Sequence, residues 1–378
     1  MESVTITTQN NRLLALDVFR GMTIAFMILV NTPGSWSHVF SPLRHAKWHG
    51  ATPTDMVFPF FLFIVGVSMF FSFSKYNQNL DAATTKKILK RVFLIFVIGL
   101  TLNYFPFYNR TLGALRIMGV LQRIALAYGL GAFICLSVPN KNLWKVGLLI
   151  LVGYWGVMYA MGTGDPFSLQ GNFAKVADLA IFGESHVYKG FGIPFDPEGL
   201  FSTIPAAVTV IFGYLVGLLI KEANDKSAMV KNLLIIGTLS IFIALVWDMY
   251  FPINKPLWTS SYVLYAGGIA SIIIGLLIEF IDVRGYQSWT KPFVVFGMNP
   301  LIIYVMSGLI VKVMLYIAKW ENASGETVKL YGWIYNEVFA GLLPSNLNLA
   351  SLLFAIFIVS ICWLFGYVLF KKRIFIKV

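Results

Sequence analysis

Ionisable side chains gather in a short segment between two membrane-length apolar stretches of this chain. The segment runs from His45 to Pro59 and contains His45, His49 and Asp55. An imidazole changes its protonation state near neutral pH, so His45 is a candidate general base at a membrane edge. Ionisable groups placed where hydrocarbon meets water are functional candidates by default. His45 is therefore the first candidate catalytic residue, although a lone interfacial histidine without a function is the common alternative.

Asp55 permits two interpretations. Together with Thr54 it can cap the N-terminus of the helix that the following apolar residues predict. It can also orient the imidazole of His45 and fix its tautomer, as a carboxylate does in catalytic triads. Asn31 ends the preceding apolar stretch, and the proline and glycine that follow it are typical of a helix terminus and a turn.

Two further groups of charged residues lie in or beside apolar stretches. Asp17 and Arg20 are three residues apart, so on a helix they share a face, either as a structural pair or as a ligand contact. Arg116 and Arg123 are about two helical turns apart, and an unpaired guanidinium in hydrocarbon is costly. We therefore expect these arginines to pair with Asp17 or Asp55, or to contact a phosphate or a thioester carbonyl.

The composition predicts the class of protein that must position these groups. Hydrophobic residues make up 58% of the chain, charged residues only 12%, and the mean hydropathy is +0.75, whereas soluble domains have about 25% charged residues. A window of about 20 residues predicts an all-α polytopic membrane protein with one domain over 1–378. Its ten predicted spans are 13–30, 56–73, 88–104, 117–138, 146–161, 204–220, 233–250, 262–281, 293–316 and 349–370.

The basic residues predict orientation rather than a nucleic-acid partner. The formal net charge is +12, but the lysines and arginines form short clusters between apolar runs and no single stripe. Of the 29, 18 fall on the side of both termini, 10 on the other side, and Arg123 lies inside the fourth span. Positively charged loops stay in the cytoplasm, so we expect both termini there. His45 and the long loops 162–199 and 318–348 are then on the opposite side.

Several signatures of other classes are missing from the sequence. Cys135 and Cys362 both lie in apolar stretches, which argues against a disulfide framework or a cysteine metal site. There is no GxxxxGK[ST], HExxH or GxSxG motif, so ATP-driven transport and serine hydrolysis are disfavoured and no metal is expected. Residues 1–11 lack the features of a secretory signal, and we expect the first apolar segment to be retained.

The ordered blocks along the chain resemble those of a known family. These blocks are 16–21, 30–31, 45–50, 54–59, 119–125, 196–199, 257–262 and 297–300. Together they resemble the heparan-alpha-glucosaminide N-acetyltransferase family, and within it the bacterial NagX-like members more than the lysosomal ones, which have an extra lumenal domain and a leading span. The order of eight blocks is far more specific than any one of them.

The resemblance implies a transmembrane acetyl transfer. Acetyl-CoA would be supplied from the cytoplasm, and the amino group of glucosamine or a terminal glucosaminide would be acetylated on the far side. The family's active-site histidine falls on His45 and its neighbouring asparagine on Asn31, and we assign Asp55 to the catalytic residues as well. His49 stands where an asparagine is also seen. We assign donor contacts to Arg20, Arg116, Gln122, Arg123, Trp258, Ser261, Tyr262 and Asn299, and acceptor contacts to Asp17, His49, Asp196 and Glu198.

Two chemical routes and two other functions remain open from the sequence. His45 could act as a general base, or it could carry the acetyl group as a covalent acetyl-imidazole. Ten spans and a proline-broken ninth helix also permit a secondary transporter of an amino sugar, and an acyltransferase for another glycan is a third possibility. The family suggests a homodimer in the bacterial inner membrane, with the lipid bilayer, acetyl-CoA and an amino sugar as partners and no nucleic acid.

Overall fold

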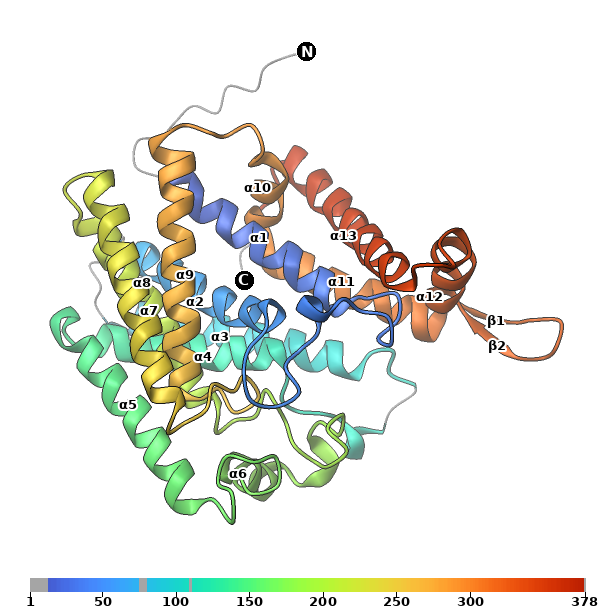
Figure 1. Ribbon diagram of the computed structural model, residues 1–378, viewed down its shortest axis with the longest axis horizontal. Coiled ribbons are helices and arrows are strands. Elements are labelled where there is room, and N and C mark those ends of the chain that lie inside the picture. The colour runs from blue at the N-terminus through green and yellow to red at the C-terminus, as the bar shows by residue number, and fades with distance from the viewer. Residues whose placement is uncertain (1–12, 75–79, 109–110, 377–378) are drawn as a thin grey trace.

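A computed structural model describes residues 13–74, 80–108 and 111–376 of the chain. Nearly all of its regular structure is helical (Figure 1). The α-helices are α1 (Leu14–Asn31), α2 (Pro53–Phe73), α3 (Ala82–Tyr104), α4 (Val120–Ser137), α5 (Asn140–Met161), α6 (Phe173–Phe182), α7 (Thr203–Glu222), α8 (Lys226–Asp248), α9 (Ser260–Leu277), α10 (Lys291–Met298), α11 (Pro300–Lys312), α12 (Leu330–Trp333) and α13 (Leu347–Lys371). The strands β1 (Lys319–Glu321) and β2 (Thr327–Lys329) form an antiparallel hairpin.

Nine helices of the described chain are long and apolar enough to cross a membrane. They are α1, α2, α4, α5, α7, α8, α13, and the helices α9 and α11 with the π-helical turns that extend them to Val283 and Ile317. The third predicted span lies in α3, which is long enough with 23 residues but carries four basic side chains in its first half. The prediction of an all-α polytopic membrane protein is confirmed.

The helices α2 and α7 approach each other closely because a glycine on each faces the backbone of the other. A Cβ on Gly66 of α2 would lie 2.0 Å from the carbonyl oxygen of Val210 in α7, and one on Gly213 of α7 would lie 1.9 Å from that of Phe63. Small residues of this kind allow membrane helices to pack through dispersion contacts, since lipid supplies no hydrophobic drive between them. The α2 and α7 helices therefore form the centre of the bundle.

The predicted ninth span is divided in two. The α10 helix ends at Met298 and α11 begins at Pro300, with Asn299 between them in a non-helical conformation. Proline removes a backbone donor and clashes with the preceding turn, so a break here was predicted from the sequence. The side chain of Asn299 binds the chain end after α13, accepting from the Ile376 amide and donating to the Ile374 carbonyl, both at 2.9 Å.

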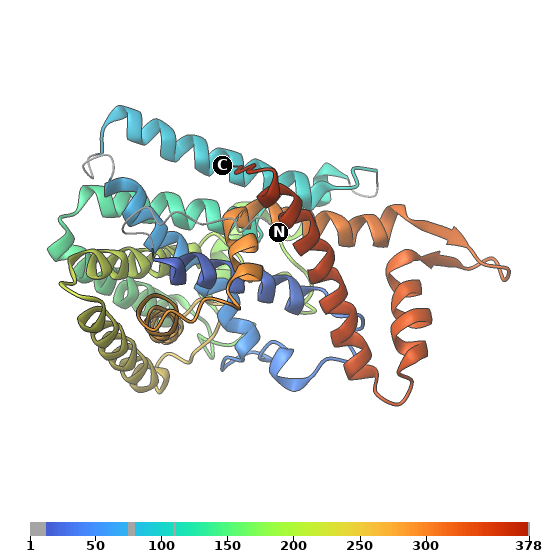
Figure 2. The ribbon, with the colours of Figure 1, turned by 90° about the horizontal axis from the view of Figure 1, so that it is seen from above.

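The two ends of the bundle differ. At one end, which we call the histidine end, α1 ends and α2, α4, α7 and α9 begin. The long connections 32–52, 162–202 and 249–259 pack together there over an aromatic cluster that includes Tyr154, Phe167, Phe195 and Phe251. At the other, which we call the tail end, α1 begins and α13 ends. Viewed from above, α12 and the β1–β2 hairpin project away from the other helices (Figure 2).

Candidate functional site

The centre of the histidine end is a pair formed by His45 and Asp55. The imidazole Nδ1 lies 2.6 Å from the Asp55 Oδ1 oxygen. The His45 side chain is 41% exposed, whereas that of Asp55 is only 3% exposed. A carboxylate at this distance holds the ring proton on Nδ1 and leaves Nε2 as the basic nitrogen. The sequence prediction that Asp55 could orient His45 agrees with this geometry.

Asp55 also caps its own helix, so the two interpretations of this residue do not exclude each other. Its Oδ2 oxygen accepts hydrogen bonds from the amides of Ala46 and Thr52 and from the Thr52 hydroxyl, all at 3.0 Å. Thr52 and Asp55 form a capping box at the start of α2. One oxygen therefore anchors the carboxylate to rigid backbone, and the other holds the imidazole. The hydroxyl of Tyr262, a residue of α9, donates a hydrogen bond of 2.5 Å to the backbone carbonyl of Asp55.

A lysine for which no role was predicted from the sequence lies beside this pair. The Lys255 Nζ lies 3.5 Å from Asp55 Oδ1 and 3.3 Å from His45 Nδ1. Burial lowers the pKa of Lys255, while the nearby Asp55 carboxylate acts in the opposite direction. In the sequence, Lys255 is a lysine in a short loop just before Pro256, and this position alone does not predict a site residue. The contact joins residues 210 positions apart and depends on tertiary structure.

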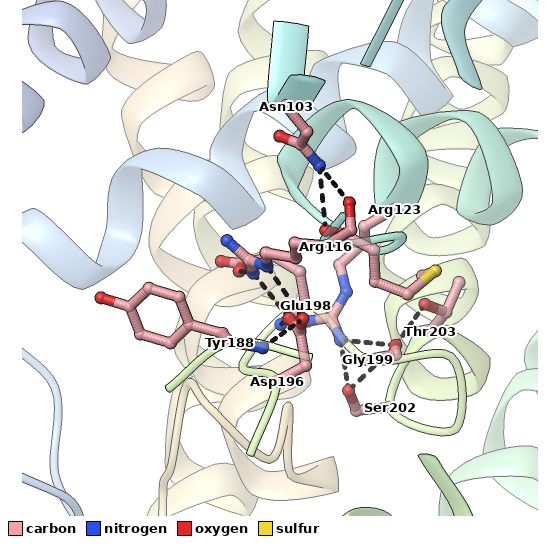
Figure 3. A network of polar contacts seen from close by, with 10 residues as sticks. Asn103, Arg116, Arg123, Tyr188, Asp196, Glu198, Gly199, Ser202 and Thr203 are labelled. Atoms are coloured by element: carbon pink, nitrogen blue, oxygen red, sulfur yellow. Dashed lines mark hydrogen bonds and ion pairs between the residues drawn. The ribbon is translucent and has the colours of Figure 1, made fainter. Parts of the chain in front are cut away.

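Arg116 binds two carboxylates from another loop, and the expected pairing with Asp17 or Asp55 is wrong. Its guanidinium forms a two-pronged contact with Asp196, at 2.9 and 2.6 Å, and reaches Glu198 at 2.5 Å (Figure 3). Burial works against the charged guanidinium, but the contacts with these carboxylates raise the pKa of Arg116 above its usual value. The reason is proximity: the loop before α7 crosses the start of α4 at the histidine end.

Asp196 is already fully engaged by protein groups. Besides Arg116, it accepts from the amides of Tyr188 at 3.2 Å and Glu198 at 3.0 Å. A carboxylate with four such contacts has little capacity left for an amino-sugar ligand. Of the two carboxylates predicted to bind the acceptor, Glu198 is the more exposed, at 13% against 1% for Asp196.

Arg123 is completely buried, and only some of its hydrogen-bond donors have a partner. Its NH2 group donates to the Gly199 carbonyl at 3.0 Å and to the Ser202 hydroxyl (Figure 3). Its guanidinium also lies 5.0 Å from the centre of the Trp258 ring. Within the described part of the chain, its Nε and NH1 groups have no hydrogen-bond partner. The expected ion pair with Asp17 or Asp55 is not formed. Two orphan donors on a buried cation suit a carbonyl or an anion.

The other residues predicted to contact the donor at this end bind the protein itself. The Trp258 indole donates to Thr209 at 3.1 Å, and the Ser261 hydroxyl donates to the Phe251 carbonyl at 2.5 Å. Gln122 is buried between α3 and α4, close to Gly99 and Gly119, and its Nε2 is unpaired among the described residues. Of these residues, Trp258 lies against the guanidinium of Arg123.

Asn31 lies at the histidine end but is turned toward its own helix. Its side-chain amide donates to the Met27 carbonyl at 2.8 Å, and the residue is exposed. His45 is anchored instead by Asp55. Asn31 marks the end of α1, as its neighbours in the sequence predicted. It has one amide oxygen available at the surface where the connection 32–52 begins.

Three predicted site residues lie at the tail end, away from His45. Arg20 contacts Asp17 at 3.2 Å, the Ser68 hydroxyl at 2.7 Å and the Gly297 carbonyl at 3.3 Å. Asp17 precedes Asn31 by 14 residues in α1, about 21 Å along the helix axis. Asn299 lies at this end too. The tertiary structure therefore separates Asp17 from the other predicted acceptor residues, and it separates Arg20 and Asn299 from the other predicted donor residues.

His49 lines an open recess of about 450 Å³ beside the connection 32–52. Asp248 and Tyr265 share this recess with apolar side chains that include Leu245 and Ile253. Burial lowers the pKa of His49, and the charges of Asp165 and Asp248 counteract that effect. One Asp248 oxygen accepts from the Ile253 amide at 2.5 Å. The recess combines a carboxylate, an imidazole and aromatic surface, which are groups that can bind an amino sugar.

The comparisons with known proteins agree with this architecture. The family described as heparan-alpha-glucosaminide N-acetyltransferase, catalytic, matches residues 12–246. The heparan-alpha-glucosaminide N-acetyltransferase of Homo sapiens is 29% identical over 428 aligned positions, covering 97% of this chain and 60% of the relative. That of Mus musculus is 28% identical, covering 97% and 61%. The chain thus spans about three fifths of the length of these relatives. It belongs to the heparan-alpha-glucosaminide N-acetyltransferase family.

Proposed function

We propose that the protein is a transmembrane N-acetyltransferase that moves the acetyl group of cytoplasmic acetyl-CoA to an amine on the opposite side of the membrane. The acceptor is glucosamine or a terminal glucosaminide. The observation that supports this proposal most directly is the contact of 2.6 Å between His45 and Asp55 at one end of the bundle, in a chain of this family. An imidazole fixed in this way is a competent general base.

In the proposed reaction, His45 acts on the attacking amine. Nε2 accepts a proton from the acceptor amine as its nitrogen attacks the thioester carbonyl carbon. A C–N bond forms, the C–S bond breaks, and the proton is returned to the CoA thiolate, which leaves as a thiol. In the alternative route, Nε2 itself attacks the thioester, the C–S bond breaks and CoA leaves as the thiolate. The acetyl-imidazolium then passes the acetyl group to the amine, whose proton goes to the thiolate. Accumulation of an acetylated His45 without acceptor would distinguish the second route.

Arg123 is the proposed donor to the developing oxyanion. The former carbonyl oxygen gains negative charge in the tetrahedral intermediate, and preorganised donors in a dry site stabilise it. The Nε and NH1 groups of Arg123 are available to donate hydrogen bonds to this oxyanion. The side chain is fully buried and held in place, so it need not move during the reaction. The N-termini of α2, α4, α7 and α9 all point toward this end, and their partial positive charges favour the same oxyanion.

We place the nucleotide of acetyl-CoA at the tail end. Arg20, Lys90, Arg91 and Lys291 are the basic residues proposed to hold its phosphates, and the pantetheine arm would run between helices toward His45. Arg20 is 22% exposed and lies 11 residues before the end of α1, a separation of about 16 Å that a flexible arm must bridge. The excess of lysine and arginine, 18 against 10, supports a cytoplasmic tail end.

The recess around His49 is the proposed binding site of the acceptor. Asp248 would attract the protonated amine, while Tyr265 offers an aromatic face to the sugar ring. Glu198, whose side chain remains partly exposed, is the second carboxylate available to the acceptor. We further propose that residues 1–378 form one membrane domain, located as a homodimer in a bacterial inner membrane.

The test is the release of free thiol from acetyl-CoA by purified protein in lipid vesicles when glucosamine is added. We expect stoichiometric thiol and N-acetylated product, and loss of both in the His45→Ala variant with folding retained. Binding of glucosamine and its uptake into vesicles without thiol release would favour a transporter. The break between α10 and α11 at Asn299 is the feature that favours this second function, because secondary transporters often contain broken helices.

A further inference from the structure

Lys255 is fixed relative to His45 by a buried asparagine next to it. Asn254 is 0% exposed, and its side-chain amide donates to the Trp48 carbonyl at 2.9 Å. Its own carbonyl oxygen accepts from the Leu257 amide at 2.8 Å. In addition, the Gly50 amide donates to the Ile253 carbonyl at 2.7 Å. The connection 249–259 is therefore bound to the loop that carries His45, and Lys255 cannot shift independently of it.

Two basic groups, the imidazole of His45 and the amine of Lys255, contact the same carboxylate oxygen of Asp55. Asp55 Oδ1 lies 2.6 Å from His45 Nδ1 and 3.5 Å from Lys255 Nζ. Because Nδ1 donates its proton to Asp55, the Lys255 Nζ at 3.3 Å from Nδ1 can donate only to the carboxylate. The two basic groups therefore compete for the negative charge of Asp55.

The positive charge belongs on Lys255 rather than on His45. An amine is intrinsically more basic than an imidazole by about four pH units. Burial reduces the pKa of Lys255, but Asp55 and the more distant Glu198 favour its charged form, while Arg123 opposes it. With the ammonium in place, a second positive charge on the imidazole would lie about 3 Å away, which is unfavourable by Coulomb's law.

We propose that Lys255 is a positioning residue that opposes protonation of His45 and keeps its Nε2 free to accept a proton. This inference rests on the proposed role of His45 as the base. Its consequence is that the enzyme stays active at a lower pH than a histidine–aspartate pair alone would allow. Asp55 on its own would favour the imidazolium, and Lys255 offsets that effect.

The first experiment measures the pH dependence of thiol release. In Lys255→Met the cation is lost and the length of the side chain is kept. We expect the acidic limb of the kcat/KM profile to move to higher pH by about one unit, and Lys255→Arg to restore the position of the wild-type limb. A merely structural lysine would change the yield or thermal stability of the protein without moving this limb, and that result would overturn the proposal.

The second experiment does not depend on activity. Diethylpyrocarbonate reacts with the neutral imidazole, and mass spectrometry of the peptides gives the reaction rate of each histidine between pH 5 and 8. His186 is an internal reference, because its Nδ1 lies 2.7 Å from the Leu115 carbonyl, whereas the Lys255 amine contacts Asp55 and His45. We expect Lys255→Met to move the His45 curve to higher pH and leave the His186 curve in place.

The two experiments separate the inference from the proposed function. If the wild-type protein released no thiol but the His45 labelling curve moved in Lys255→Met, the transferase proposal would fail and the lysine effect would stand. If thiol release were normal and neither the labelling curve nor the acidic limb moved, the role of Lys255 would be wrong and the transferase proposal would stand.

Discussion

The side-chain amide of Asn254 donates a hydrogen bond to the backbone carbonyl of Trp48, 206 residues earlier in the chain, at 2.9 Å. The Trp48 indole in turn donates to the Phe167 carbonyl at 2.8 Å. Through these two contacts, three connections at the histidine end form one layer over the ends of the helices. The precision of the candidate site depends on this layer, since loops by themselves hold side chains loosely.

Asn254→Ala should therefore lower both stability and activity. The change leaves the Trp48 carbonyl and the Leu257 amide without their partner, which costs about 1 to 3 kcal/mol for each buried group. We expect a lower midpoint of thermal unfolding in detergent and a lower kcat. Asn322→Ala is the control, because Asn322 lies at the β1–β2 hairpin and its side chain forms hydrogen bonds with Ser324 and Glu326 of the same turn. An unfolding midpoint equal to that of wild type would contradict the role of Asn254.

Asp55→Asn should separate capping from catalysis. An asparagine can still accept hydrogen bonds at the start of α2, but a neutral amide no longer holds the proton of His45 on Nδ1. We expect kcat for thiol release to fall by about 10²- to 10⁴-fold. Asp81→Asn is a matched control, since Asp81 caps α3 by accepting from the Thr84 amide at 2.7 Å. If Asp55→Asn retained wild-type turnover, His45 would not need a carboxylate partner.

Arg123→Lys should affect the chemical step more than binding. Lysine keeps the positive charge but lacks the planar fork, so it cannot keep the contacts with Gly199 and Ser202 and also supply two free donors. We expect kcat to fall by about 10²- to 10³-fold, with a small change in KM for acetyl-CoA. The control is Arg284→Lys at the surface, where the guanidinium contacts Glu279. A loss of thermal stability with unchanged kcat would assign Arg123 to the structure alone.

Asp178 should make the protein less stable as the pH rises. It is 2% exposed, one of its oxygens has no partner among the described residues, and burial raises its pKa to about 6. The folded protein therefore binds a proton that the unfolded chain releases near pH 4, and the free energy of unfolding falls between about pH 4 and 6. The loss is about 2 to 3 kcal/mol.

The variant Asp178→Asn tests this pH dependence. Asparagine remains neutral and can still accept from the Phe201 amide, which donates to Asp178 at 3.0 Å. We expect the variant to be more stable than wild type at pH 7 and similar to it at pH 4, as measured by thermal unfolding in detergent. A stability difference that does not change with pH would show that Asp178 is not the titrating group.

Local sequence determined much of the fold and part of the candidate site. Apolar runs of about 20 residues have no alternative to a helix in lipid, because every backbone group must find its partner within the segment. Pro300 predicted the break before α11. Asp55 was a candidate both for the cap of α2 and for the partner of the imidazole, and it has both roles, but its capping partner is Thr52 and not the expected Thr54. The short distance between these residues along the chain made their contact predictable.

Contacts between distant segments were decided only by the tertiary structure. Arg116 binds Asp196 rather than Asp17 or Asp55, and Lys255 contacts His45 although the two are 210 residues apart in the chain. Asp17 lies about 21 Å along the α1 axis from Asn31 at the histidine end. No periodicity specifies which loops meet, because that choice depends on how the helices pack. Each helix follows from the local sequence, because its backbone hydrogen bonds form within the segment. The partners of the charged side chains depend instead on how all the helices pack together.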